Sequence, residues 1–192
     1  MVQFIVRWIA TLWLIFWIIW LLAAFASKRS VRRQTSGSRF LQIVLLFIGL
    51  VFIFDFWNFF NRGWLAARLV PQTPFWVLSG ATLTVAGILF CFWARAILGR
   101  NWSGTVTLKQ DHELIQRGPY AFVRHPIYTG LLTGMLGTAI VYGLVRCFTG
   151  VLICTLALWI KSQTEEQFMI QQFGEQYLQY RRQVRALIPY VL

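Results

Sequence analysis

The sequence predicts an all-α, polytopic membrane protein with about five transmembrane helices. Three observations lead to this fold class: long uncharged apolar runs, few charged residues, and cations gathered at the ends of the runs. Of the 192 residues, 58% are hydrophobic and only 12% are charged, and the mean hydropathy is +0.61. Soluble globular domains carry about 25% charged residues, so the composition excludes that class.

The cations indicate a membrane surface as partner. The formal net charge of +12 could suggest nucleic-acid binding. However, the lysines and arginines cluster beside apolar segments, where cytoplasmic loops face anionic lipid, so we expect no nucleic-acid partner. The three cysteines, Cys91, Cys147 and Cys154, have no CxxC pairing and no histidine cluster beside them. We therefore expect neither a metal site nor a disulfide framework, and interpret them as small packing residues.

The first predicted span covers residues 2–26. A signal peptide is the alternative, because Ala24-Phe25-Ala26 resembles a cleavage site. The apolar stretch is too long for that, and five cations follow it directly: Lys28, Arg29, Arg32, Arg33 and Arg39. These features favour an uncleaved anchor.

Four more apolar segments follow. The predicted spans cover residues 40–60, 74–98, 127–145 and about 147–160, with Arg146 marking the turn between the last two. A polar segment of residues 99–123 separates the third span from the fourth. The helix of the fifth span is expected to continue out of the bilayer through Lys161 and Glu166 to Phe173, because no Gly or Pro interrupts it before Gly174.

The distribution of cations predicts the orientation. With five spans and the N-terminus outside, the cation-rich segments after the first and third spans and the C-terminal tail all lie in the cytoplasm. The polar segment and the tail are therefore expected on the same side of the membrane. This divides the chain into three N-terminal transmembrane helices (1–98) and a C-terminal portion (99–192) with a cytoplasmic loop, a helical hairpin and a tail.

The start of the fourth span combines polar groups that carry chemistry. Arg124-His125-Pro126 precedes it, and proline at a first helical turn loses no hydrogen bond. An ordinary helix start with an arginine reaching the headgroups would explain Arg124. His125 and Tyr128 are three residues apart, so they project from one helix face and present imidazole and phenol together at the membrane surface.

Adjacent glutamates follow about forty residues later. Lys161 lies one turn before Glu165, so an ion pair at spacing i,i+4 explains Glu165. Glu166 points about 100° away around the helix, and is the better candidate to contact a polar group from outside it.

Other polar and small residues have ordinary explanations. Asp55, placed inside the second span, is a functional candidate by default, but its position near the helix end favours contact with headgroups. Gly130, Gly134 and Gly137 form a small-residue face that lets helices approach closely. Residues 111–120 are expected to form a surface or re-entrant loop, and the sequence does not distinguish it from a plain connector.

A series of short motifs fills the second half of the chain. In order they are Asn101-Trp102-Ser103, His112-x-Leu114-Ile115, Gly118-x-Tyr120, Arg124-His125-Pro126-x-Tyr128-x-Gly130, Glu165-Glu166, Phe173-Gly174-x-x-Tyr177-x-x-Tyr180 and Ile188-Pro189-Tyr190. At these spacings the set resembles the integral membrane methyltransferases of the isoprenylcysteine carboxyl methyltransferase and phospholipid N-methyltransferase superfamily. The resemblance covers about residues 99–192.

The resemblance implies S-adenosyl-L-methionine as methyl donor, bound by the C-terminal half. Matched by motif, the residues that would line the adenine side are His112, Glu113, Leu114 and Ile115. Those that would contact the rest of the cofactor are Tyr120, His125, Pro126, Ile127, Tyr128 and Glu166. The superfamily also places a basic residue near the methyl acceptor. Lys161 holds that position here, where arginine is common.

The resemblance therefore implies methyl transfer to a lipophilic acceptor at the membrane–cytoplasm interface. The acceptor would be an isoprenylcysteine-like carboxylate or a lipid headgroup, and the sequence leaves this choice open. One alternative is an NADPH-dependent membrane reductase of the sterol-reductase type, which the short chain and the paired glutamates disfavour. Another is a non-enzymatic membrane subunit that binds no donor. The compact chain leads us to expect a prokaryotic cytoplasmic membrane.

Overall fold

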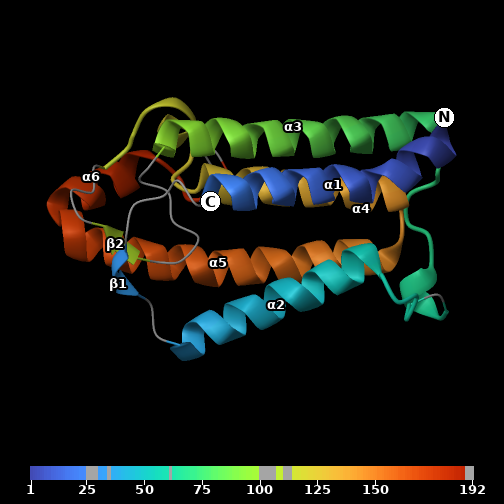
Figure 1. The fold of residues 1–192 in the computed structure, drawn as a ribbon, viewed down its shortest axis with the longest axis horizontal. Coiled ribbons are helices and arrows are strands. Elements are labelled where there is room, and N and C mark those ends of the chain that lie inside the picture. The colour runs from blue at the N-terminus through green and yellow to red at the C-terminus, as the bar shows by residue number, and fades with distance from the viewer. Residues whose placement is uncertain (25–29, 34–35, 61, 100–106, 110–113, 189–192) are drawn as a thin grey trace.

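Five helices run side by side through most of the molecule (Figure 1). The computed structural model describes residues 1–24, 30–33, 36–60, 62–99, 107–109 and 114–188. The five helices are α1 (Val2–Ala24), α2 (Ser36–Phe54), α3 (Pro74–Leu98), α4 (Pro126–Tyr142) and α5 (Val145–Phe173). A short helix, α6 (Glu175–Gln183), follows α5 at one end of the bundle. The expected all-α class is confirmed for the described helical body.

A small antiparallel ribbon is the main departure from an all-helical structure. Strand β1 (Ser30–Arg33) pairs with β2 (Thr107–Lys109), with Ser30 opposite Lys109 and Arg33 opposite Thr107. The ribbon lies near α6, at the end of the bundle where the C-terminal tail also folds (Figure 1). It therefore joins the segment after α1 to the segment after α3, and both are on the side that we expect to be cytoplasmic.

Two helix pairs form the body. α3 packs along α4, and α2 packs along α5, with α4 next to α5 and α1 against α3 and α4. Glycines make the α3–α4 contact close, since a Cβ at Gly137 would lie 2.5 Å from the carbonyl oxygen of Gly80. Buried hydroxyls join three helices: Trp13 Nε1 donates to Thr138 Oγ1 over 2.8 Å, and Thr84 Oγ1 lies 3.3 Å from the same atom.

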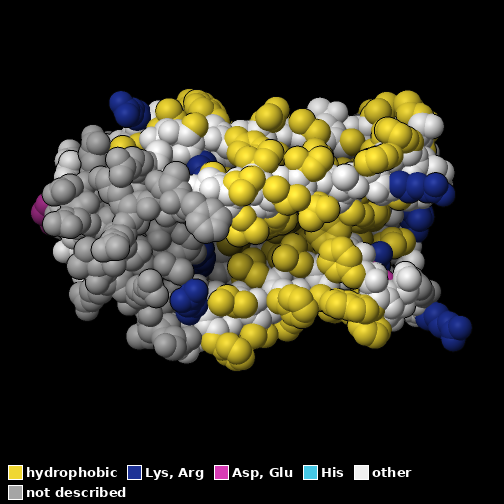
Figure 2. All heavy atoms as spheres, viewed as in Figure 1, with side chains coloured by type: hydrophobic (Ala, Val, Ile, Leu, Met, Phe, Trp, Pro, Cys, Tyr) yellow, Lys and Arg dark blue, Asp and Glu magenta, His cyan; other side chains and the backbone are white. Residues whose placement is uncertain are grey.

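The outer face of the helices is apolar. Large hydrophobic side chains of α1 and α2, including Leu21 and Phe40, are well exposed, as expected for contact with lipid tails. Figure 2 shows that on one face such side chains cover the middle of the molecule, whereas Lys and Arg lie toward its ends. Three described helices are long and apolar enough to cross a membrane: 2–23, 74–98 and 145–173. Residues 39–54 and 126–142 form shorter apolar helices. The chain is thus an integral membrane protein.

Helix α2 ends earlier than expected. The predicted span reached residue 60, but the helix stops at Phe54, and Asp55 takes a positive φ of 45°. The Asp55 carboxylate accepts the backbone N–H groups of Phe59 (2.8 Å) and Phe60 (3.3 Å) and holds the turn that follows. The placement of Asp55 inside a helix was therefore wrong.

The last turn of α2 is also tied to α5. Arg146 Nη1 donates to the carbonyl oxygens of Phe52 and Ile53 over 2.7 and 2.9 Å, and Arg146 Nε lies 3.8 Å from Asp55 Oδ2. The Asp55 side chain is only 1% exposed, so it does not reach the headgroups. Arg146 was expected in a turn, but it lies in the first turn of α5 and is buried.

Helix α5 extends as predicted. It continues without a break past Lys161 and ends at Phe173, where Gly174 takes a positive φ of 52° and α6 begins. The extension carries Glu165 and Glu166 beyond the apolar part of the helix and beside the residues that precede α4.

Candidate active site

The turn before α4 is fixed by the C-terminal tail. The backbone N–H of Arg124 donates to the carbonyl of Arg185 (2.8 Å), and that of His125 donates to Ala186 (3.0 Å). Thr129 Oγ1, one turn into α4, donates to the carbonyl of Leu187 over 2.6 Å. Pro126 starts α4 at a position where its missing N–H is not needed. The backbone that carries the predicted site residues is therefore well defined.

His125, Tyr128 and Glu165 meet at this turn. The Tyr128 phenol donates a hydrogen bond of 2.5 Å to Glu165 Oε1, and His125 Nδ1 lies 3.5 Å from Glu165 Oε2. The imidazole and phenol rings are parallel to within 3°, with centroids 5.4 Å apart. Residues that are about forty positions apart in the chain thus form one contiguous polar cluster.

Glu166 is surrounded by cationic side chains. Its Oε1 atom accepts hydrogen bonds from Arg124 Nε (2.9 Å) and Nη2 (2.6 Å), and lies 3.2 Å from His125 Nε2. Arg181 Nε is 3.2 Å from Oε2, close enough for an ion pair but not aligned as a hydrogen-bond donor. The Glu166 side chain is 2% exposed, whereas that of Glu165 is 25% exposed. Of the two carboxylates, Glu165 is the accessible one.

The two carboxylates control the charge of His125. Burial by itself would lower the pKa of His125, but the hydrogen bonds and negative charges of Glu165 and Glu166 outweigh it and raise the pKa above its ordinary value. The pKa of Tyr120 is also raised, mainly by burial and further by the charge of Glu165, so this phenol stays neutral. The site thus combines an imidazole with a raised pKa, the neutral phenol of Tyr120 and two carboxylates.

The structure brings most of the predicted site residues to one end of the bundle. Ile115 and Tyr120 are buried together with Ala94, and Ile127 packs against that cluster. Pro126 is buried at the helix start, and Leu114 is partly buried. The Lys161 ammonium lies 5.3 Å from the centroid of the Tyr128 ring. His112 and Glu113 lie outside the described residues.

Two residues of the cluster were not expected there. An ion pair with Lys161, one turn earlier, was a sufficient explanation for Glu165 in the sequence. In the structure Glu165 contacts both Tyr128 and His125. Arg181 lies in the C-terminal part of the chain, whose cations were used only to predict the orientation, yet it reaches Glu166 from α6. For Glu165 a usable signal existed, because two adjacent acids among only six in the chain precede the polar motif of the tail.

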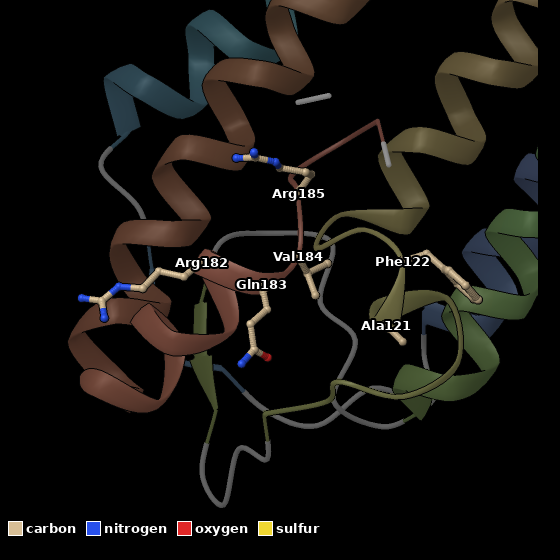
Figure 3. A pocket seen from close by; sticks show the side chains of 6 residues that line it. All are labelled: Ala121, Phe122, Arg182, Gln183, Val184 and Arg185. Atoms are coloured by element: carbon tan, nitrogen blue, oxygen red, sulfur yellow. The ribbon is translucent and has the colours of Figure 1, made fainter. Parts of the chain in front are cut away.

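A cavity of about 270 Å³ lies beside the same turn. It is lined by Ala121 and Phe122 on one side and by residues 182–185 of the tail on the other. Figure 3 shows the side chains of Arg182 and Arg185 extending away from Ala121 and Phe122. The tail thus covers the turn on one side and borders a hollow on the other.

Comparison with known proteins assigns the chain to a family. Residues 75–176, more than half of the chain, match the phospholipid methyltransferase family. The chain belongs to this family of membrane proteins, which confirms the resemblance seen in the sequence motifs. The matched region contains α3 from its second residue and all of α4 and α5, and therefore both halves of the polar cluster.

Named relatives are similar over about half to two thirds of the chain. The protein-S-isoprenylcysteine O-methyltransferase of Schizosaccharomyces pombe is 37% identical over 99 residues, which cover 48% of this chain and 41% of that protein. A probable protein-S-isoprenylcysteine O-methyltransferase of Oryza sativa subsp. indica is 29% identical over 134 residues, or 65% of this chain and 69% of that protein. In the first two relatives, from S. pombe and Tribolium castaneum, the similarity spans 41% and 34% of their length.

A solved structure shares the fold. The eukaryotic intramembrane Ras methyltransferase ICMT (isoprenylcysteine carboxyl methyltransferase) superposes with a TM-score of 0.54 at 22% sequence identity, covering 82% of this chain and 54% of that one. At this identity the similarity concerns the fold alone. It extends beyond the region matched in sequence and includes most of the helical body described above.

Proposed function

We propose that this chain is an enzyme that transfers a methyl group from S-adenosyl-L-methionine to a lipophilic acceptor at the membrane–cytoplasm interface. The acceptor is an isoprenylcysteine-like carboxylate or a lipid headgroup. The observation that carries the proposal is the contact between the turn before α4 and the extension of α5. There His125 and Tyr128 meet Glu165 within hydrogen-bonding reach. The named relatives are, by name, isoprenylcysteine O-methyltransferases.

The polar cluster fits the methyl donor chemically. The donor carries an ammonium group, a sulfonium charge and ribose hydroxyls. Carboxylate oxygens can accept hydrogen bonds from the ammonium and hydroxyl groups and can neutralise the positive charges. Glu165 is accessible, with 25% of its side chain exposed, and it is already oriented by Tyr128. Methyl transfer from a sulfonium is an in-line displacement, so the chain's task is to align the reactants and exclude water.

The residues proposed to bind the donor are those expected from the sequence, with Glu165 in place of Glu166. His112, Glu113, Leu114 and Ile115 are proposed for the adenine side, and Tyr120, His125, Pro126, Ile127 and Tyr128 for the remainder. Ile115, Tyr120 and Ile127 pack together, which supports a single apolar wall. Lys161, over the Tyr128 ring, is proposed to face the acceptor.

The proposed topology has five crossings with the N-terminus outside. The shorter helices α2 and α4 lie along the longer helices α5 and α3, which supports their crossing as well. The turn between α4 and α5 and the segment after α2 are joined at the end opposite the site, since Leu69 and Val70 donate to the carbonyl of Gly143. In this topology the catalytic portion, residues 99–192, binds donor from the cytoplasm. A prokaryotic cytoplasmic membrane as host stays a prediction.

Ligand binding tests the proposal directly. Purified protein in detergent is titrated calorimetrically with S-adenosylhomocysteine and, separately, with NADPH. We expect saturable binding of the first only, and its loss in His125→Ala protein that keeps the wild-type helical circular dichroism. Binding of NADPH alone would support the reductase alternative, and binding of neither would support a non-enzymatic subunit.

The acceptor is identified by its products. Incubation with radiolabelled donor and either a prenylated cysteine analogue or phosphatidylethanolamine vesicles distinguishes a carboxyl from an amine acceptor. A carboxylate is a nucleophile near neutral pH without a base, whereas an amine must first lose a proton. A carboxyl methyl ester is released by mild alkali and an N-methyl group is not, so the label also reports the bond that was formed.

A further inference from the structure

The two adjacent glutamates have different surroundings. Glu165 contacts a phenol and an imidazole and remains 25% exposed, whereas Glu166 is 2% exposed and lies among Arg124, His125 and Arg181. A buried carboxylate is stable only when it is paired and hydrogen-bonded. Here Arg124 supplies two N–H donors to one oxygen.

Arg124 connects Glu166 to the C-terminal tail. While Nε and Nη2 of Arg124 bind the carboxylate, Nη1 donates to the backbone carbonyls of Arg181, over 3.2 Å, and Val184. Arg181 itself reaches the other carboxylate oxygen from α6. One side chain of α5 thus holds the turn before α4 and the tail after α6 in a single ionic cluster.

The backbone of the proposed site depends on this cluster. The amides of Arg124 and His125 donate to the tail carbonyls of Arg185 and Ala186, so any displacement of the tail releases the residue that starts the polar motif. Tyr180 Oη, also in α6, donates to the carbonyl of Tyr120 over 2.6 Å. Contacts from the tail therefore support both sides of the turn.

We propose that Glu166 is a positioning residue: it holds His125 and the C-terminal tail in place and does not itself contact the methyl donor. The identity of the ligand rests on the proposed function, whereas the role of Glu166 in holding His125 and the tail does not. It also replaces the expectation that Glu166 would hydrogen-bond the cofactor.

Two neutral variants on the same helix turn separate the roles. Glu166→Gln keeps the size of the side chain and removes the charge that binds Arg124 and Arg181. Glu165→Gln is the matched control, with the same chemical change one residue away. Each full-length protein is measured for S-adenosylhomocysteine affinity by calorimetry and for amide exchange in the peptide that contains Arg124 and His125.

The proposal predicts opposite patterns. Glu166→Gln is expected to speed exchange at Arg124 and His125 by about tenfold or more, because local opening needs less free energy when the tail is released. Its donor affinity is expected to fall only about threefold, through the displaced His125. Glu165→Gln is expected to leave that exchange within about twofold of wild type and to weaken donor binding about tenfold, a loss typical of one charged contact.

Arg181→Gln is a second test of the ionic cluster, for the case that the Glu166 variant does not fold. The Arg181 side chain is 45% exposed and leaves the Arg124–Glu166 pair in place, so the protein should fold and show the same faster exchange in weaker form. Exchange peptides from the middle of α3 serve as the internal reference.

Equal losses of donor affinity in the two glutamine variants, with exchange at Arg124 and His125 unchanged, would make Glu166 a direct ligand and overturn the proposal. If wild-type protein binds no S-adenosylhomocysteine, the proposed function fails. The exchange comparison still decides whether Glu166 holds the tail.

Discussion

Tyr128 and Glu165 are joined by a hydrogen bond of 2.5 Å between the phenol and a carboxylate oxygen. Tyr128 lies one turn into α4 and Glu165 lies in the extension of α5, so this bond crosses between the two helices that carry the proposed site. The phenol thereby fixes Glu165, the more accessible of the two adjacent glutamates. The His125 ring, stacked on Tyr128, lies 3.5 Å from the other oxygen of the same carboxylate.

Removing the phenolic hydroxyl tests the importance of this bond. In Tyr128→Phe the Glu165 carboxylate loses its donor and is no longer oriented. A hydrogen bond to a charged group contributes about 1.5–3 kcal/mol, so we expect S-adenosylhomocysteine affinity to fall about tenfold. Isothermal titration calorimetry measures the change. Tyr142→Phe, at the other end of α4, is the control and should bind normally; an unaltered affinity in Tyr128→Phe would argue against an oriented Glu165.

The protonation of His125 predicts a pH dependence of stability. Its pKa is raised above the ordinary value of 6.5 by Glu165 and Glu166 despite burial. Since the folded protein holds this proton more tightly than the unfolded chain, the stabilisation is complete below pH 6.5. It is lost as the pH rises from there through the raised pKa of the folded state.

Apparent melting temperatures of wild-type and His125→Gln protein, followed by intrinsic fluorescence between pH 5.5 and 9, check this prediction. The difference between the two proteins should be largest at the acidic end and shrink as the pH increases. Glu165, Glu166 and Tyr128 contact the imidazole, and Arg124 binds Glu166. All four residues are present in both proteins, so their own titration largely cancels in the comparison. A difference that grows with pH would contradict a raised pKa.

Helix boundaries show what the sequence could predict. The extension of α5 to residue 173 followed from local information, because no residue before Gly174 breaks a helix. The end of α2 did not. Hydropathy continues through the aromatic residues after Asp55, and the helix stops because the Asp55 carboxylate binds the following amides while Arg146 binds the last carbonyls. The contacts of Arg146 come from a segment about ninety residues away, which no local pattern contains.

The candidate site was predicted only in part, again because contacts between distant segments are absent from local patterns. The helical spacing of His125 and Tyr128 placed both groups at the membrane surface, and the structure stacks their rings. The choice between Glu165 and Glu166 depended on which helix face meets α4. That is a matter of tertiary packing, which the local sequence does not contain. An ion pair with the lysine at i−4 was a sufficient local explanation for Glu165. The three-dimensional arrangement makes Glu165 the accessible carboxylate and Glu166 the enclosed one.

Arg146 is expected to be essential for stability and not for ligand binding. It is buried at the end of the bundle opposite the site, where it binds the carbonyls of Phe52 and Ile53 and lies close to Asp55. Arg146→Gln leaves a buried carboxylate without its cation, a change that costs about 3–5 kcal/mol. We expect a lower apparent melting temperature with donor affinity unchanged in the protein that remains folded. Arg62→Gln is the control: Arg62 is exposed and lies close to Asp55 in the sequence, so this variant should melt like wild type.

Gly87 sets the distance between α3 and α4. A Cβ at this position would meet the backbone nitrogen of Gly134 and lie 2.5 Å from the carbonyl oxygen of Gly130. Both are backbone atoms, so the helices themselves must separate to accept a methyl group. Overpacking of this kind destabilises by about 1–3 kcal/mol, which exceeds the helix-propensity gain of about 1 kcal/mol from glycine to alanine.

We therefore expect Gly87→Ala to lower the apparent melting temperature and to weaken S-adenosylhomocysteine binding. The added methyl group displaces α4, and with it His125 and Pro126 at the start of that helix. Gly37→Ala in α2 is the matched control: nothing lies within 4 Å of the position its Cβ would take, so only the propensity gain remains. Melting curves in the same detergent compare the two. Equal melting temperatures for the two variants would show that α3 and α4 separate without loss, and that the close glycine contact does not hold the site in place.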